Sequence, residues 1–163
     1  MSNAKKHCLL VVDDEPYIAD SVHDLLRHEF KVLRAYSAEE ATHLLDEQEV
    51  HIVMTDQRMP QMTGVELLKH ARVRHPSAVR MLFTGFADIE AIIAAINQGH
   101  IFGFLQKPWR PEEIEERVRE AAREYDRIDG ETEEAARVRA EVGSMRDRIA
   151  ALEEEVRRLR AAK

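Results

Sequence analysis

Short apolar runs alternate with longer amphipathic stretches over the first two thirds of this 163-residue chain, and this alternation most restricts its fold. The pattern is typical of βα units arranged around a parallel sheet. The first run, residues 7–12, is almost continuously apolar, as expected for a strand buried on both faces. The predicted strands are residues 7–12, 32–33, 51–55, 80–84 and 101–105. We therefore predict an α/β fold with a doubly wound, five-stranded parallel sheet.

Apolar residues at helical spacing predict the helices between these strands. One helix begins near Pro16, and three others cover residues 38–48, 64–74 and 88–98. Gly99 is the expected C′ residue of the last of these. Each predicted helix lies between two predicted strands, so the elements follow one another as consecutive βα units.

A different composition begins at Pro111, a favourable first-turn residue after which no proline occurs. The remaining residues are rich in charge and predict one long helix or two. Apolar residues recur there in alternating steps of three and four, which is the heptad spacing of a coiled coil. A first series runs from Ile114 to Ile128. A second series forms a predicted dimer seam of Val138, Val142, Met145, Ile149, Leu152, Val156 and Leu159.

The two heptad series are out of phase near Asp129-Gly130, which fits either an overwound coiled coil or a break into two helices. The seam extends beyond a small domain, and such a surface predicts a partner strand, most simply in a homodimer. The chain is thus divided into residues 1–6, 7–127 and 128–163. The first segment is a disordered start in which Ser2-Asn3-Ala4 resemble a cloning remnant. The second is the α/β domain, and the third is a coiled-coil helix for dimerisation.

Polar side chains follow four of the five predicted strands. Asp13 and Asp14 follow the first, Asp56 the third and Lys107 the fifth, while Thr84 ends the fourth. In an open parallel sheet, ligands bind outside the carboxyl ends of the strands, so these groups should gather in one crevice. Three carboxylates at close range need a counter-charge, which a hard cation and Lys107 can supply. Oxygen ligands suit Mg²⁺, which also bridges to phosphate oxygens. The crevice therefore predicts a phosphate site with Mg²⁺ as its cofactor.

These residues resemble the receiver domain of two-component response regulators over roughly residues 7–127. Four separate motifs in matching order and spacing carry the resemblance. They are Asp13-Asp14-Glu15, the segment Asp56-Gln57-Arg58-Met59-Pro60-Gln61-Met62-Thr63-Gly64, then Thr84-Gly85, and finally Lys107-Pro108. The resemblance implies a flavodoxin-like sheet of strand order 2-1-3-4-5. It also implies a partner, namely a sensor histidine kinase or a phosphotransfer protein.

By this resemblance, Asp56 accepts the phosphoryl group. Asp14 would bind Mg²⁺ directly, Asp13 more indirectly, and Asp56 and the backbone carbonyl of Arg58 would complete the protein ligands. Thr84 would bind one phosphoryl oxygen, and Lys107, preceding a cis bond to Pro108, would pair with another. The chain would then catalyse only its own phosphorylation and dephosphorylation.

The resemblance implies a switch as well, in which the Thr84 hydroxyl moves toward the phosphoryl group and Phe104 fills the space it leaves. The affected surface would comprise the fourth helix, the fifth strand and the fifth helix, which leads into the heptads. Arg58 and Phe86 flank the acceptor and are expected to slow hydrolysis by restricting water. The sequences around Asp56, Thr84 and Lys107-Pro108-Trp109 resemble receivers of hydrogenase-regulating NtrC-type activators and of cyclic-dinucleotide phosphodiesterase regulators. Trp109 is expected to anchor the start of the fifth helix.

Composition excludes several other classes of protein. The 31 acidic residues outnumber the 24 basic ones, which argues against nucleic-acid binding by these residues. No apolar run is long enough to span a membrane, and the start lacks the apolar stretch of a signal peptide.

The single cysteine, Cys8, is expected to be buried and inert in a reducing cytoplasm. The eight histidines show no metal-ligand spacing and are expected at the surface.

Two other functions compete with a receiver. A haloacid-dehalogenase-type phosphatase also uses an aspartyl phosphate, but it needs its nucleophile and acid two residues apart, whereas Asp13-Asp14 are adjacent and no acidic pair follows Lys107. A structural dimer that has lost its chemistry conflicts with the complete set of site residues. The sequence ends at Lys163 without a recognisable output domain, so we expect either an effector beyond it or a stalk that is itself the output.

Overall fold

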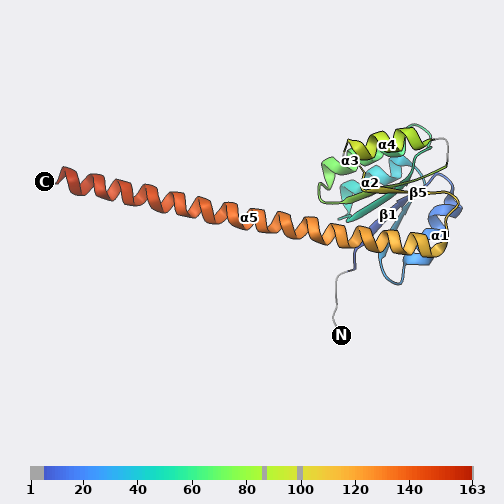
Figure 1. Cartoon of the computed structure of the whole chain (residues 1–163), viewed down its shortest axis with the longest axis horizontal. Coiled ribbons are helices and arrows are strands. Elements are labelled where there is room, and N and C mark those ends of the chain that lie inside the picture. Colours follow the sequence, from blue (N-terminus) through green and yellow to red (C-terminus); the bar gives the residue numbers. More distant parts are fainter. Residues whose placement is uncertain (1–5, 86–87, 99–100, 163) are drawn as a thin grey trace. The chain divides into compact units, whose positions relative to one another are not determined.

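The chain divides into two compact units, Met1–Asp126 and Arg127–Lys163. The computed structural model describes residues 6–85, 88–98 and 101–162 (Figure 1). Gly99 lies outside these residues. Within them, no helix is long and apolar enough to cross a bilayer.

The first unit is built on five parallel strands in the order β2-β1-β3-β4-β5, as predicted. The central strands β1 and β3 are buried along their whole length, which explains their nearly continuous apolar sequence. Strand β2 lies at one edge and exposes Lys31 and Arg34. The strands are β1 (Cys8–Val12), β2 (Lys31–Ala35), β3 (Ile52–Asp56), β4 (Val79–Thr84) and β5 (Gly103–Gln106).

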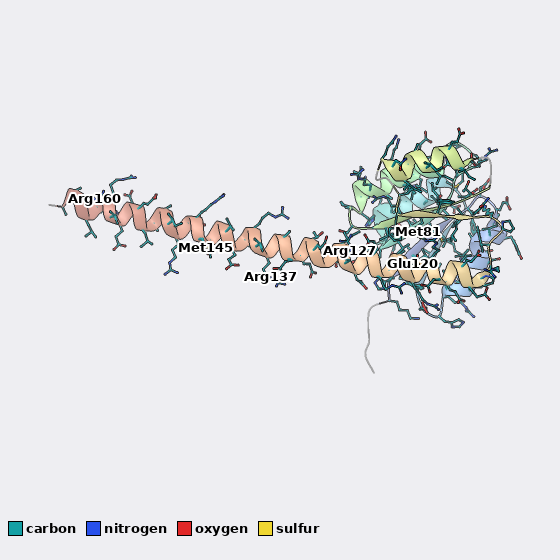
Figure 2. All side chains as sticks on the ribbon, viewed as in Figure 1. Met81, Glu120, Arg127, Arg137, Met145 and Arg160 are labelled. Carbon is teal, nitrogen blue, oxygen red and sulfur yellow. The ribbon has the colours of Figure 1, made fainter. Side chains whose placement is uncertain are left out.

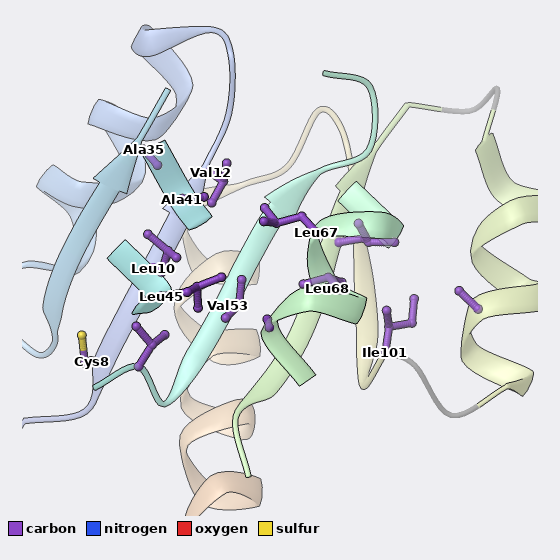
Figure 3. Close-up of a cluster of buried hydrophobic side chains, with 14 of the residues drawn as sticks. Cys8, Leu10, Val12, Ala35, Ala41, Leu45, Val53, Leu67, Leu68 and Ile101 are labelled. Carbon is purple, nitrogen blue, oxygen red and sulfur yellow. The ribbon is translucent and has the colours of Figure 1, made fainter. Parts of the chain in front are cut away.

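Helices cover both faces of the sheet (Figure 1). On one face α2, α3 and α4 bury small and aliphatic residues against the strands, in the cluster shown in Figure 3. On the other face lie α1 and the first turns of α5, whose buried residues include Val22 and Val118. The helices are α1 (Pro16–Leu26), α2 (Ala38–Glu47), α3 (Gly64–Arg74), α4 (Ile89–Asn97) and α5 (Pro111–Ala161).

Local sequence signals fix where two of these helices begin. The Ser37 hydroxyl accepts a hydrogen bond from the Glu40 N–H at the start of α2. At the start of α3, Thr63 and Glu66 form a reciprocal capping box, which satisfies two backbone donors. Because α3 follows the loop after Asp56, this cap also fixes one side of the crevice.

Helix α5 is continuous from Pro111 to Ala161, so the chain does not break into two helices near Gly130. The change of heptad phase is thus accommodated within one helix. A Cβ at Gly130 would meet no atom within 4 Å, so the helix tolerates this glycine without depending on it.

Several element bounds differ by one or two residues from those expected, and the expected exposure of one histidine was wrong. Strand β5 begins at Gly103 instead of residue 101, because Ile101 is buried ahead of it and Phe102 makes the connecting hydrogen bond, its N–H donating to the Arg80 carbonyl. His51 is 7% exposed and does not lie at the surface. Its Nδ1 accepts the Cys8 N–H at 2.9 Å, and its ring lies 4.5 Å from that of Tyr125. Helical and strand periodicity does not reveal a side chain that binds backbone.

Candidate functional site

The sheet brings together the three aspartates predicted from the sequence. Val12 pairs with Thr55, so the residues that follow, Asp13 and Asp56, emerge side by side at the carboxyl ends of β1 and β3. Asp13 is completely buried, and Asp56 is 8% exposed. Asp13, Asp14 and Asp56 each offer an oxygen within 4.8 Å of the others. The predicted acidic crevice therefore exists in the fold.

Lys107 provides the positive charge of this crevice. Its Nζ lies 3.0 Å from Asp13 Oδ2 and 3.3 Å from Asp56 Oδ1. The peptide bond between Lys107 and Pro108 is cis, as the resemblance implied. Just beyond it, the Trp109 ring packs 5.1 Å from the ring of Phe83, which suits its predicted role as an anchor. Lys107 thus joins the buried aspartates across the end of the sheet.

The crowding of these groups appears in their pKa values. The pKa of Asp56 is raised to about 6, mainly by burial; the charge of Lys107 opposes the rise and that of Asp13 adds to it. Burial also raises the pKa of Asp13, against the hydrogen bonds from the Glu15 N–H and Lys107. Burial alone would lower the pKa of Lys107, but the two carboxylates raise it overall. Additional positive charge would relieve the cost of keeping both buried carboxylates ionised.

The donor set suits Mg²⁺. It consists of oxygens alone, from two buried carboxylates and one exposed carboxylate. Mg²⁺ prefers oxygen ligands, keeps several waters and takes one or two carboxylates with substrate phosphates. The exposed side of Asp14 leaves room for such waters, so the residues present fit the ion.

Thr84 and Arg58 both contact a carboxylate that the sequence analysis did not select, that of Asp88. Arg58 Nε lies 2.9 Å from Asp88 Oδ2, and Thr84 Oγ1 lies 3.4 Å from the same oxygen. The Thr84 hydroxyl is also 3.0 Å from the Gly85 carbonyl. The hydrogen bond and charge of Asp88 raise the pKa of Arg58. Asp88 precedes α4, a position that sequence spacing alone relates only to a helix cap.

An open depression of about 330 Å³ lies over these groups. Arg58 and Asp88, from the loops after β3 and β4, both line the depression and form an ion pair with each other. The depression is lined by Asp14, Glu15, Asp56, Arg58, Gly85, Asp88 and Lys107. It is large enough for a phosphoryl group with its hydration.

Gly64 lets the start of α3 approach the acceptor closely. A Cβ at this position would overlap the backbone carbonyl of Asp56 and the side chain of Leu82. The Gly64 N–H donates to the Gln57 carbonyl, and the amide oxygen of Gln57 accepts from the Val65 N–H. These contacts tie the loop after Asp56 to α3. The motif contained both residues, but their positioning role depends on tertiary contacts.

The remaining predicted site residues have different outcomes. Phe104 on β5 is half-buried and packs against the core, beside Leu82 in the sheet. Phe86 lies outside the described residues. The assignment of the Arg58 carbonyl as a metal ligand stays a prediction, while the Arg58 side chain points its guanidinium to Asp88.

Comparison with known proteins agrees with this geometry. Residues 9–119 match the response regulator receiver domain family. The hydrogenase transcriptional regulatory protein HoxA of Cupriavidus necator is 44% identical over 117 residues, covering 72% of this chain and 24% of that protein. The HoxA protein of Bradyrhizobium diazoefficiens is 41% identical over 127 residues, covering 78% and 26%. The chain thus spans about a quarter of the length of these curated relatives.

A solved structure extends the comparison to the fold. The signal receiver domain of an HD domain-containing protein from Pseudomonas fluorescens is 33% identical, with a TM-score of 0.69, over 74% of this chain and 98% of that one. This chain belongs to the response regulator receiver family, whose members receive phosphoryl groups from histidine kinases in signalling. The predicted likeness to hydrogenase regulators is confirmed as a sequence similarity.

Proposed function

We propose that this chain is a phosphoacceptor whose Asp56 receives a phosphoryl group from a histidine of a sensor kinase or phosphotransfer protein. The observation that carries the proposal is the meeting of Asp13, Asp14, Asp56 and Lys107 at one end of the sheet, with Thr84 ending the adjacent strand. An Asp56 carboxylate oxygen forms a bond to phosphorus while the bond from phosphorus to the donor nitrogen breaks. The imidazole leaves with the electron pair and takes up a proton.

Asp56 must be ionised to attack, and its surroundings decide when it is. Because its pKa is about 6, Asp56 is largely ionised at neutral pH, with Lys107 beside it to balance the charge. Lys107 is also placed to bind a phosphoryl oxygen. Mg²⁺, held by Asp13, Asp14, Asp56 and the Arg58 carbonyl, would neutralise charge on the transferring group. Apart from its own phosphorylation and dephosphorylation, the chain is proposed to turn over no substrate.

The same contacts suggest how phosphorylation is signalled. The Thr84 hydroxyl, now near Asp88 and the Gly85 carbonyl, would turn to a phosphoryl oxygen, and Phe104 would occupy the space it leaves. This rearrangement would alter the surface formed by α4, β5 and the first turns of α5. Ile93 and Phe102 already expose apolar area there. Helix α5 continues into the heptads, so the altered surface would affect dimerisation through residues 128–163.

The function of an output domain can be proposed only from the relatives of this chain. The HoxA relatives are transcriptional regulators and are about four times longer than the matched region. We accordingly assign this chain to the cytoplasmic control of gene expression through an output domain outside residues 1–163. With its acidic balance, the chain itself is not expected to bind nucleic acid.

Phosphorylation can be tested by incubating the chain with acetyl phosphate and Mg²⁺ and measuring its intact mass. We expect a gain of one phosphoryl group, located at Asp56 and lost in Asp56→Asn or in EDTA. A cognate kinase should label the same residue. The molecular mass in solution with and without beryllofluoride, a phosphoryl mimic, then tests the dimer and its link to the site. If no phosphoryl donor labels Asp56, the proposal is contradicted.

A further inference from the structure

The second unit carries a row of large apolar side chains that nothing in that unit covers. Seven residues between Val138 and Leu159 are 41–63% exposed along the single helix, on which Figure 2 labels Met145. Their steps of four and three place them at the a and d positions of a heptad. Position a is filled by Val142, Ile149 and Val156, and position d by Val138, Met145, Leu152 and Leu159.

The residue types at these positions select a kind of partner. All three a positions are β-branched, and the last two d positions are leucine. In coiled coils, Ile or Val at a with Leu at d favours two parallel strands, whereas other distributions favour trimers or tetramers. The occupant that fits is therefore one further helix with the same pattern.

The charges beside the seam identify that helix as a second copy. In a parallel pair, each g residue faces the e residue five positions later on the partner. Glu141 would face Arg146 of the other copy, and Arg148 would face Glu153. Glu155 would likewise face Arg160, so all three positions join opposite charges.

These six flanking residues are also available for a partner. Among the described residues, the ion pairs of this part of the helix are those of Glu154 with Arg157 and Arg158, on the face away from the seam. Within the described part of this helix, the six e and g residues take part in none of the ion pairs. Their charges therefore remain to be compensated between chains.

Antiparallel pairing matches the charges less well. One antiparallel register that packs a positions against d positions places Glu141 opposite Glu155 and Arg148 opposite its own copy, and it leaves Leu159 outside the apolar overlap. Shifting the partner by one heptad joins Arg148 to Glu155 and Arg146 to Glu153. It also opposes Arg139 with Arg160 and leaves Val138 outside the apolar overlap, whereas the parallel register has no such opposed pair. Like charges directly opposed destabilise a particular pairing.

We propose that residues 138–160 form a parallel, in-register, two-stranded coiled coil with a second copy of this chain. Its register is specified by three charge pairs between the chains: Glu141 with Arg146, Arg148 with Glu153, and Glu155 with Arg160. This inference rests on the proposed dimerisation and adds the orientation and the residues that determine it. The two chains would run side by side, so both segments that follow Lys163 in a longer protein would leave from the same end.

Reciprocal charge reversal in the full chain tests the pairing. One variant carries Glu141→Arg and Glu155→Arg, the other Arg146→Glu and Arg160→Glu. Each should dimerise at least about tenfold more weakly than the parent, because two kinds of attractive pair become repulsive. An equal mixture should recover parental affinity as a heterodimer. Asp147→Arg with Glu154→Arg, which reverses two acidic residues on the outer face, is the matched control and should leave the dimer constant within about twofold.

Disulfide trapping tests the orientation. Leu159→Cys should form a covalent dimer with itself in a redox buffer, since identical d positions meet only in parallel register. The unsubstituted chain, whose Cys8 is buried, gives the background. A mixture of Leu159→Cys and Val142→Cys that links only residue 159 to residue 142 would show antiparallel pairing and overturn the inference. A chain that remains monomeric throughout would overturn it as well. Labelling of Asp56 by acetyl phosphate in the same samples would show that the phosphoacceptor function stands independently.

Discussion

As the proposed phosphoacceptor, Asp56 must be both buried and charged, and this conflict makes its effect on stability depend on pH. Its pKa in the fold, about 6, lies above its ordinary value of 3.8. The protonated form is therefore favoured by folding. The resulting stabilisation is present below the ordinary pKa and is lost as pH rises through about 6.

We expect Asp56→Asn to raise the free energy of unfolding by on the order of 1–3 kcal/mol near pH 7.5, measured in EDTA. The gain should shrink as pH falls toward 4, because the carboxyl of the parent then becomes protonated too. Urea denaturation of both proteins across this pH range measures it. A difference that stayed constant with pH would mean that burial of the charge is not its cause.

Binding of a divalent cation should relieve the repulsion between the carboxylates of the crevice. Millimolar Mg²⁺ should raise the melting temperature of the parent, because a ligand that binds only the folded state stabilises it by mass action. Asp14→Asn should remove most of this response while costing little stability by itself, since Asp14 is exposed. Asp24→Asn, an exposed carboxylate on α1, is the control and should respond like the parent. Equal responses in all three proteins would count against a magnesium site.

The Arg58–Asp88 ion pair suggests where the lifetime of the phosphoryl group is set. Arg58 lines the depression and is paired with Asp88, a position from which it can restrict water. We expect Arg58→Asn combined with Phe86→Ala to lose phosphate roughly tenfold faster, a change of about 1.4 kcal/mol in barrier. Asp88→Asn keeps both bulky groups and serves as the control for loss of the ion pair alone. The decay of the phosphorylated mass after acetyl phosphate is removed gives the rates, and an unchanged rate in the double variant would refute the role.

At the scale of elements, the sequence was most informative where local and tertiary signals agree. Helix α3 begins at Gly64 and ends at Arg74 as predicted, because Thr63 caps it and its apolar spacing is regular. The acidic crevice was predictable because polar residues end buried strands. The contacts of Asp88 were not, since they depend on how two loops meet above the sheet. The burial of His51 escaped prediction for a similar reason: its ring accepts a hydrogen bond from the backbone of Cys8, which is 43 residues away in the sequence.

Two glycines in helices should respond in opposite ways to alanine. At Gly64 the added methyl group would overlap the Asp56 carbonyl, so we expect a loss of about 2 kcal/mol or more and slower phosphorylation. At Gly143 the methyl group meets nothing within 4 Å, and the exposed helix should gain up to about 1 kcal/mol. Circular dichroism during urea denaturation and acetyl phosphate labelling measure both effects. Equal effects at the two positions would show that the close approach at Gly64 does not matter.

At the scale of the whole molecule, the two units share one element, helix α5. The proposed phosphoryl site lies in the first unit and the proposed dimer seam in the second, so the proposed signalling requires that each influence the other. Such an influence is a coupling free energy and must be reciprocal. Because a dimer carries two sites, the factor by which beryllofluoride changes the dimer constant must equal the square of the factor by which dimerisation changes the beryllofluoride affinity of each site.

We expect the dimer constant to change by at least about fivefold, the lower end of usual allosteric coupling. Sedimentation with and without beryllofluoride gives the effect on the dimer, and titration of beryllofluoride below and above the dimer constant gives the effect on the site. A chain carrying Ile149→Asp should remain monomeric and show one beryllofluoride affinity at every protein concentration, because the seam is lost while the site is intact. If the parent dimerises and binds beryllofluoride with both factors equal to one, the stalk holds two receivers together without reporting their phosphorylation. A change in the dimer constant that differs from the square of the change in affinity per site would point instead to a further state of association, since this relation holds for any single dimerisation step with two equivalent sites.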